Sequence, residues 1–249
     1  MRYTTIIFDL GGTLLGYTEC SVVKAFVGSY QESGLRVDHA RIKELLHSLR
    51  GVAPERENPS PVYSPQDLGL LRTQASGSDW VRAYGPSSVR VVSRRLARCF
   101  HRMKFDALFD DAKPVLQNLQ ARGLNLGVLS NFTPDCEGLL QNLGIYDYFD
   151  FLVISSMVGV EKPEPIIFEL AVEAAGCAKE QILYVGDSIF QDAEGASKAG
   201  LDVILINRSS KYPDTHFHVI GSLLELEDFL TSKFSAVRAL SSTLSILQK

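Results

Sequence analysis

The feature that most constrains the fold is an alternation of short apolar runs with amphipathic segments, most of which end at a glycine. The apolar runs have the length of strands, and the segments between them have the period of a helix. The expected strands are 4–9, 124–129, 151–154, 181–185 and 203–206, and the expected helices are 112–122, 136–143, 165–175 and 191–199. Strands that alternate with helices in this way build a parallel sheet covered on both faces. The sequence therefore predicts an α/β fold whose core is a Rossmann-like, doubly wound parallel sheet.

A helical insertion is expected after the first strand. Between Glu19 and about Phe105 no convincing buried strand occurs, while apolar residues recur at helical spacing around Val22, Ile42 and Val91. The stretch 51–79 holds several prolines and serines and is expected to be rich in loops. Three parts follow from this pattern, namely a core of 1–15 and 106–230, a helical cap of 16–105, and a C-terminal amphipathic helix or tail at 231–249.

Composition excludes some classes of partner. The chain of 249 residues is long enough for a full core, and its formal net charge of −4 gives no general basis for binding nucleic acid or an anionic membrane. The four cysteines lie far apart without a C-x-x-C pair, which is typical of free thiols in a reducing compartment. No signal peptide or apolar stretch of transmembrane length is visible, so a cytoplasmic enzyme or binding protein is expected.

Polar clusters lie at the ends of the expected strands or in the loops that follow them. They are Asp9 with Thr13, Ser130-Asn131, Lys162-Pro163, and Asp187 with Asp192. Parallel strands place their carboxyl ends at one edge of a sheet, where open α/β sheets bind ligands. The sequence therefore predicts one shared site at this edge.

The residue types in these clusters suit phosphoryl chemistry. Asp9 and Asp187 would repel each other unless a cation lies between them, and Mg²⁺ is typically held by one or two carboxylates. Lys162 adds a compact positive charge that keeps Asp9 ionised and attracts an anion. Ser130 and the amides near Gly11 and Gly12 can donate to phosphoryl oxygens. Such a set favours in-line attack by a carboxylate on phosphorus, followed by hydrolysis of the aspartyl-phosphate.

Together these clusters resemble the four motifs of the haloacid dehalogenase-like hydrolase superfamily, and the insertion resembles its small α-helical cap. Within this superfamily, the motifs of the chain are most similar to those of the branch named haloacid dehalogenase-like hydrolase domain-containing protein 3. The resemblance implies an aspartyl nucleophile at Asp9, an orienting Lys162, and Mg²⁺ bound by Asp9, Asp187 and the carbonyl of Gly11. It implies that Asp192 supports these residues, that Ser130 takes part in catalysis, and that the substrate is bound by Gly12, Thr13, Ser130, Asn131 and Lys162. The implied substrate is a small phosphorylated molecule.

Gly11 departs from the pattern of the phosphatases in this superfamily, which have an acid/base Asp two residues after the nucleophile. Glycine cannot protonate a leaving alkoxide, and a positioned acid/base contributes roughly 10²–10⁴ in rate. Three hypotheses stay open. The chain is a weak or narrow Mg²⁺-dependent phosphatase, a catalytically impaired protein that binds a phosphorylated ligand or a protein partner, or a phosphonatase or dehalogenase-type hydrolase.

Two residue types bear on the third hypothesis. Dehalogenases of the superfamily need no metal and lack the counterpart of Asp187, so this residue argues against dehalogenation. A phosphonatase needs a cap lysine for a Schiff base. Lys24 and Lys43 are available, but both are typical of a helix surface.

The expected cap is basic in the segment 82–104. Arg94, Arg98 and Arg102 share one helical face if this segment is one helix. The face is either solvated or a docking surface for an anionic substrate or partner, and its few aromatic residues do not indicate nucleic-acid binding. Trp80 and Tyr84 are expected in the cap core or on its inner surface. The oligomeric state, monomer or homodimer, stays open.

Overall fold

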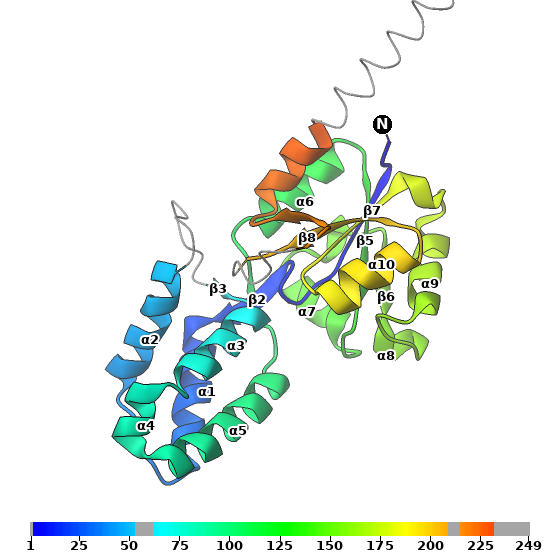
Figure 1. Ribbon diagram of the computed structural model, residues 1–249. Helices are drawn as coiled ribbons and strands as arrows, with labels where there is room; N and C mark the ends of the chain where they lie inside the picture. Colours follow the sequence, from blue (N-terminus) through cyan, green and yellow to red (C-terminus); the bar gives the residue numbers. More distant parts are fainter. Residues whose placement is uncertain (1, 53–61, 209–214, 232–249) are drawn as a thin grey trace, which may run out of the picture. The chain divides into compact units, whose positions relative to one another are not determined.

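The computed structural model describes residues 2–52, 62–208 and 215–231 (Figure 1). The chain divides into two compact units. One unit contains the residues up to Leu14, Asp110–Arg208 and the described residues that follow, and we call it the core unit. The other is Leu15–Phe109, which we call the cap unit. Among the described residues, no helix has both the length and the apolar character needed to cross a membrane.

The core unit is built on a six-stranded sheet in which every pairing is parallel. The strand order is β6-β5-β1-β7-β8-β9. The strands are β1 Thr5–Phe8, β5 Asn125–Ser130, β6 Phe151–Ile154, β7 Ile182–Gly186, β8 Asp202–Ile206 and β9 His218–Ile220. The central strand β1 is in register with both neighbours, so that Ile6 lies opposite Leu126 and Leu183. The sequence predicts five of these strands, whereas β9 is too short to show a period.

Helices cover both faces of this sheet. The helical elements are α6 Ala112–Ala121, α7 Cys136–Asn142, α8 Ser155–Val158, α9 Pro165–Ala175 and α10 Glu194–Lys198, with 3₁₀ turns at Tyr146–Tyr148 and Lys179–Gln181. Ile7 and Tyr184 pack in one cluster with residues of α9 and α10. Ile6 and Phe8 point to the opposite face and are equally buried, because successive side chains of a strand alternate. The predicted α/β fold with a doubly wound parallel sheet is confirmed.

The helix predicted at 191–199 begins differently. Its first turn is a π-helical segment, Ile189–Ala193, and α10 continues from it. Ser188 caps this turn by accepting from the amide of Gln191 at 3.2 Å. The wide turn is associated with the polar contacts of Asp192, and π-bulges inside helices are frequent at functional sites.

The cap unit is helical, with one small sheet. Its helices are α1 Glu19–Gln31, α2 His39–Val52, α3 Pro65–Gln74, α4 Ser78–Tyr84 and α5 Pro86–Arg102. The sheet has the order β3-β2-β4, with β2 Leu15–Thr18, β3 Val62–Tyr63 and β4 Ala107–Leu108 in antiparallel pairs. Trp80 is buried in the core of this unit beside Tyr30, with ring centroids 5.5 Å apart, and Tyr84 packs against both. The core interpretation of Trp80 and Tyr84 is therefore the correct one.

The loop-rich interpretation of 51–79 is wrong for residues 62–79. Ser64 caps α3 by accepting from the amide of Asp67, Asp67 accepts from the amide of Ser64, and Pro65 stands in the first turn. This reciprocal cap satisfies amides that a helix start leaves unpaired, so a stretch rich in serine and proline still folds as a helix. Residues 53–61 lie outside the described residues. So do residues 232–249, which are all but the first residue of the C-terminal helix or tail predicted at 231–249.

Candidate active site

Three strands of the core unit end at the candidate site. Asp9 follows β1, Ser130 is the last residue of β5, and Asp187 follows β7. Because β1 lies between β5 and β7 and is parallel to both, these three residues meet at one edge of the sheet. The chain proceeds from β1 to β5 on one side and returns to β7 on the other, so this edge is a topological switch point.

Asp9 is buried and held by several donors. Its Oδ1 accepts hydrogen bonds from Ser130 Oγ at 3.0 Å and from Lys162 Nζ at 2.6 Å. Its Oδ2 accepts a longer contact from Thr13 Oγ1 at 3.4 Å. The amide of Asp9 donates to the carbonyl of Val185 at 2.9 Å, which extends the pairing of β1 with β7 by one step. The carboxylate is therefore fixed in position, with one oxygen more heavily engaged than the other.

Lys162 is the cation of the site and is 3% exposed. Its three donors reach Asp9 Oδ1 at 2.6 Å, Asp192 Oδ1 at 2.6 Å and Tyr184 OH at 3.1 Å. Burial alone would lower the pKa of Lys162, but the charges of Asp192 and Asp9 outweigh burial and raise the pKa above its usual value. The amine therefore carries its proton throughout the neutral range.

Asn131 holds the backbone at Lys162. Its Nδ2 donates to the carbonyl of Lys162 at 3.0 Å, and its Oδ1 accepts from the amide of Lys162 at 2.8 Å. The sequence predicts Asn131 among the substrate-binding residues, and the structure shows both ends of its amide on the main chain of Lys162. This pairing ties the loop before α9 to the end of β5.

Asp192 organises the loop that carries Asp187. Its Oδ1 accepts from Tyr184 OH at 2.7 Å as well as from Lys162, and its Oδ2 accepts from the amides of Asp187 at 3.1 Å and Ser188 at 2.9 Å. Gly186 is required for this arrangement, because a Cβ there would lie 2.4 Å from Asp192 Cγ. The acceptor positions of Asp192 are thus filled by protein donors.

The site concentrates negative charge. Carboxylate oxygens of Asp9, Asp187 and Asp192 lie within 4.8 Å of one another, and all three residues are buried. When ionised they exceed the charge of Lys162 by two. Burial raises the pKa of Asp9, Asp192 adds to the rise, and Lys162 opposes it. A divalent cation would neutralise this excess, and the all-oxygen donor set suits a hard ion such as Mg²⁺.

The turn after β1 presents backbone to the site. The amides of Thr13 and Leu14 both donate to the carbonyl of Leu10, at 3.3 and 2.9 Å. Gly12 is buried with a φ of 83°, a left-handed conformation that favours glycine. Gly11 is half-buried and offers only main-chain groups.

Two residues that sequence reasoning missed complete the site. Tyr184 lies on β7 and touches Lys162 and Asp192; its only signal is a hydroxyl within an otherwise apolar strand. Arg208 follows β8, and its Nη2 and Nε donate to the carbonyl of Thr13 at 2.6 and 3.2 Å. Its guanidinium also makes a two-point contact with Asp111 at 2.9 and 3.0 Å. Asp187 was selected because it lies just after a predicted strand. Arg208 lies just after the predicted strand 203–206, so the same criterion would have selected it.

Comparison with known proteins places this geometry in a family. Residues 3–200 match the model of the haloacid dehalogenase-like hydrolases. The chain belongs to the haloacid dehalogenase-like hydrolase family. It is 35% identical to haloacid dehalogenase-like hydrolase domain-containing protein 3 of Danio rerio, over 89% of this chain and 93% of the relative. It is 32% identical to a glyceraldehyde 3-phosphate phosphatase of Methanopyrus kandleri, over 84% of this chain and 85% of that protein.

Solved structures of this family share the fold. The putative haloacid dehalogenase-like hydrolase YfnB from Bacillus subtilis, a structure described as bound to magnesium, is similar with a TM-score of 0.58. The match covers 93% of this chain and all of that chain at 20% identity. Gly11, two residues after Asp9, has no side chain that could act as an acid or a base at this site. Among the described residues, the acids grouped with Asp9 are Asp187 and Asp192, and Asp192 already has its acceptor positions filled.

Proposed function

We propose that the chain is a Mg²⁺-dependent phosphatase-type hydrolase that acts on small phosphorylated molecules through an aspartyl nucleophile. The observation that carries this proposal is the contact of Asp9 with Ser130 and Lys162 at the switch point of the sheet. A buried carboxylate fixed by a cation and a hydroxyl is suited to in-line attack on phosphorus. The relatives named as phosphatases support the same class of reaction.

The roles of the residues follow from their contacts. A carboxylate oxygen of Asp9 attacks phosphorus, the bond to the leaving oxygen breaks, and water later hydrolyses the aspartyl-phosphate to release phosphate and restore Asp9. Lys162 favours the ionised form of Asp9 against the effect of burial and offers positive charge to the phosphoryl oxygens. Ser130 and Thr13 both donate to the carboxylate of Asp9, which supports a role for their hydroxyls as donors to the phosphoryl oxygens of a substrate.

The donor set fits Mg²⁺. Asp9 and Asp187 would hold the ion together with the carbonyl of Gly11, while Asp192 would keep its contacts to Lys162, Tyr184 and the loop amides. The excess of two negative charges in the site supports a divalent ion. When bound, the ion would neutralise charge that develops on the phosphoryl group.

Gly11 limits the range of leaving groups. Without an acid at this position, an alkoxide would leave unprotonated, which costs roughly 10²–10⁴ in rate, or about 3–5 kcal/mol of barrier. Aryl and acyl phosphates need little or no protonation of the leaving group. We therefore expect turnover of these esters and slow turnover of alkyl phosphates.

A second function, binding of a phosphorylated ligand without rapid turnover, is favoured by the same glycine. The site would then keep Lys162, Ser130 and the metal ligands for binding alone. The acidic group of three residues speaks against a C–halogen hydrolase, because the attack of a carboxylate on carbon needs no such cluster. Lys24, considered for a phosphonatase, is exposed on α1, and the side chain of Lys43 is not described.

The test is hydrolysis of p-nitrophenyl phosphate by the wild-type chain, Asp9→Asn and Gly11→Asp, each with Mg²⁺ and with a chelator. The proposal expects Mg²⁺-dependent turnover by the wild type and none by Asp9→Asn. An inert wild type whose activity appears only in Gly11→Asp would support the binding function. Equal activity in the wild type and Asp9→Asn would remove the nucleophile assignment.

A further inference from the structure

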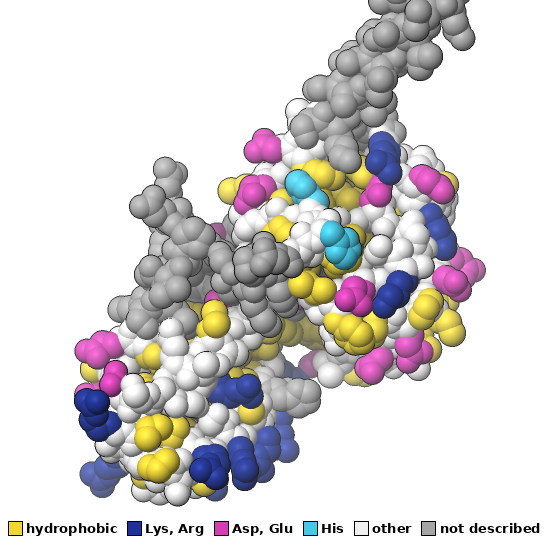
Figure 2. Space-filling view, in the orientation of Figure 1, with side chains coloured by type: hydrophobic (Ala, Val, Ile, Leu, Met, Phe, Trp, Pro, Cys, Tyr) yellow, Lys and Arg dark blue, Asp and Glu magenta, His cyan; other side chains and the backbone are white. Residues whose placement is uncertain are grey.

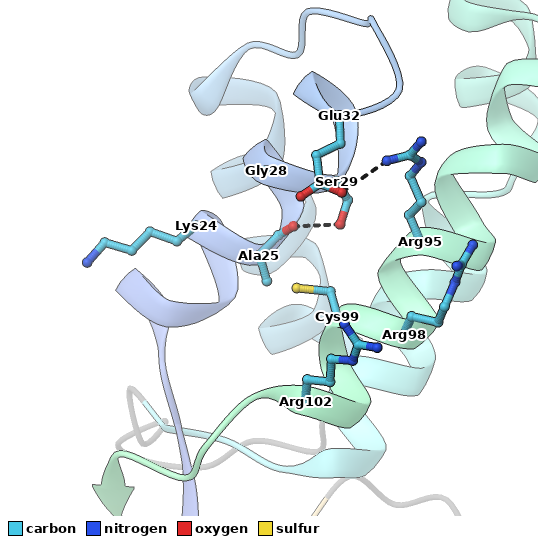
Figure 3. Close-up of a pocket in the computed structure, with 9 residues that line it drawn as sticks. All are labelled: Lys24, Ala25, Gly28, Ser29, Glu32, Arg95, Arg98, Cys99 and Arg102. Carbon is cyan, nitrogen blue, oxygen red and sulfur yellow. Dashed lines mark hydrogen bonds and ion pairs between the residues drawn. The ribbon is translucent and has the colours of Figure 1, made fainter.

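A second candidate site lies entirely within the cap unit. A pocket of about 340 Å³ opens between α1 and α5 (Figure 3). It is lined by Lys24, Ala25, Gly28, Ser29, Glu32, Arg95, Arg98, Cys99 and Arg102. None of these residues belongs to the group around Asp9. The volume lies at the lower end of the range of cavities that bind small molecules, roughly 300–1,000 Å³.

Small residues create this pocket. Ala25, Gly28 and Ser29 on α1 face Cys99 on α5, and Arg95, Arg98 and Arg102 extend from α5 beside them, while Lys24 on α1 points away from α5 (Figure 3). A Cβ added at Gly28 would meet no atom within 4 Å, so nothing in the packing requires glycine there. Glycine inside a helix is destabilising relative to alanine. The gap is therefore kept open at a cost in helix stability, which points to an occupant.

The charge around the pocket is strongly positive. The lining includes four cations and one acid, namely Lys24, Arg95, Arg98, Arg102 and Glu32. Arg95 Nη1 pairs with Glu32 at 3.0 Å, which neutralises one cation. Within the described part of the chain, Lys24, Arg98 and Arg102 have no ion-pair partner, so a formal charge of three remains uncompensated. Figure 2 shows Lys and Arg side chains gathered on the cap unit.

The arginines are arranged for a phosphate. Arg98 and Arg102 stand one turn apart on α5 and both reach the pocket. A guanidinium presents a planar pair of donors that matches two phosphoryl oxygens, and Lys24 adds a compact charge from the facing helix. A neutral metabolite would not compensate the positive charge of these side chains. A nucleic acid would need a long basic surface with aromatic side chains, and the pocket has none.

We propose that this pocket binds a small anion with one or more phosphoryl groups, held by Arg98 and Arg102 beside the small residues of α1, with Lys24 adding positive charge at the edge. The site is a binding site for a ligand and not a second catalytic site, since no nucleophile with a general base lines it. The proposal is independent of the chemistry at Asp9 and holds whether or not the chain turns over a phosphate ester.

Inorganic pyrophosphate is the probe, titrated into the full-length chain by calorimetry in the presence of a chelator. Arg98→Ala/Arg102→Ala is compared with Arg90→Ala/Arg94→Ala, which removes the same charge at the same spacing from exposed positions of α5 outside the pocket. We expect the first pair to weaken binding by at least about tenfold, and the second by less than about threefold. Equal losses in both pairs would show a diffuse basic face and overturn the proposal.

Gly28→Leu tests the cavity itself. The variant keeps every charge, fills the floor of the pocket and replaces a helix-interior glycine with a better helix former. We expect it to fold and to lose pyrophosphate binding. Undiminished pyrophosphate binding by Gly28→Leu would mean that the anion binds to the open surface of the helices. That result would contradict a pocket site.

Cys99 supplies a local readout because it lines the pocket, whereas Cys20 is exposed elsewhere on the cap unit. Alkylation by iodoacetamide, followed residue by residue with mass spectrometry, should slow at Cys99 when pyrophosphate is present and stay unchanged at Cys20. The protection should vanish in Arg98→Ala/Arg102→Ala. Binding of pyrophosphate around Asp9 alone would leave Cys99 unprotected, and that result would refute the assignment.

Discussion

Replacing Tyr184 with Phe should destabilise the chain by about 3 kcal/mol and lower kcat several-fold. The Tyr184 hydroxyl donates to Asp192 at 2.7 Å and accepts from Lys162 at 3.1 Å, and all three side chains are buried. Phenylalanine fills the same volume in the strand, so packing is retained and only the polar contacts are lost. The change therefore isolates the contribution of one hydroxyl.

The expected loss of stability depends on how well Lys162 and Asp192 keep their other hydrogen bonds once the hydroxyl is removed. A hydrogen bond to a charged group contributes about 1.5–3 kcal/mol, and an unsatisfied buried partner costs the full desolvation of that group. Two charged partners are affected, but the Lys162 ammonium keeps Asp9 and Asp192, and Asp192 keeps Lys162 and two amides. We therefore expect a loss of about 3 kcal/mol, at the lower end of the combined range of about 3–6 kcal/mol. The fall in kcat comes from looser positioning of Lys162 against Asp9.

Tyr3→Phe is the matched control. Tyr3 also donates its hydroxyl to a carboxylate, Asp202 Oδ2, at 2.8 Å. The Asp202 side chain is 40% exposed, so water can replace the lost donor and the expected loss is only about 0.5–1.5 kcal/mol with no change in kcat. Urea denaturation and steady-state p-nitrophenyl phosphate assays measure both quantities. Equal loss of stability in the two variants, or an unchanged kcat in Tyr184→Phe, would refute the reasoning.

Four further predictions concern the scaffold. Burial raises the pKa of Asp111, but the charge of Arg208 and the hydrogen bonds from Arg208, Ser222 and the amide of Leu223 together lower it below its usual value. The contribution of Asp111 to stability is therefore full above the unfolded pKa of about 3.9 and is lost as pH falls through the folded pKa. Asp111→Asn should accordingly flatten the acid limb of a stability–pH curve, and an unchanged slope would contradict this. Gly28→Ala should raise the free energy of unfolding by about 0.5–1 kcal/mol, since the added methyl meets nothing, as thermal melts can show. Gly195→Ala should lower it by about 1–3 kcal/mol, because the methyl would lie 2.6 Å from Phe168. Arg208→Lys should remove the two-point contact with Asp111 and weaken phosphate inhibition through the loosened turn at Thr13; unaltered inhibition would contradict that role.

The sequence predicted the site better than the interior of the cap unit. Asp9, Ser130 and Asp187 follow apolar runs of strand length, so their meeting at one edge needs only the knowledge that the strands are parallel. Tyr184 was missed because a tyrosine inside a buried strand most often packs in the core, and only the tertiary structure shows its hydroxyl on Lys162. Strands of two or three residues, such as β3 and β9, carry no measurable period.

The basic face of α5 is a second feature that the sequence predicts only in part. Arg94, Arg98 and Arg102 share a face by spacing, but only the last two line the pocket. The pocket is lined from α1 by Lys24, Ala25, Gly28, Ser29 and Glu32, and none of these neighbours is indicated by the sequence of α5. Ala25 and Gly28 leave space beside Arg98 and Arg102, and this pairing of distant segments has no counterpart in the local sequence.

The turn after β1 also explains why Gly11 is informative. Gly12 has a φ of 83° and must be glycine to avoid strain, whereas Gly11 is not among the glycines with positive φ. An L-residue can therefore occupy position 11 without left-handed backbone strain. Gly11→Asp tests the missing proton donor once its melting temperature matches that of the wild type, and Gly12→Asp, which forces a side chain onto a left-handed backbone, is the structural control. A gain of about 10²–10⁴ in alkyl phosphate turnover by the first variant alone would show that the missing proton donor limits the wild-type rate. No gain in a folded Gly11→Asp chain would show that the limit lies elsewhere in the site.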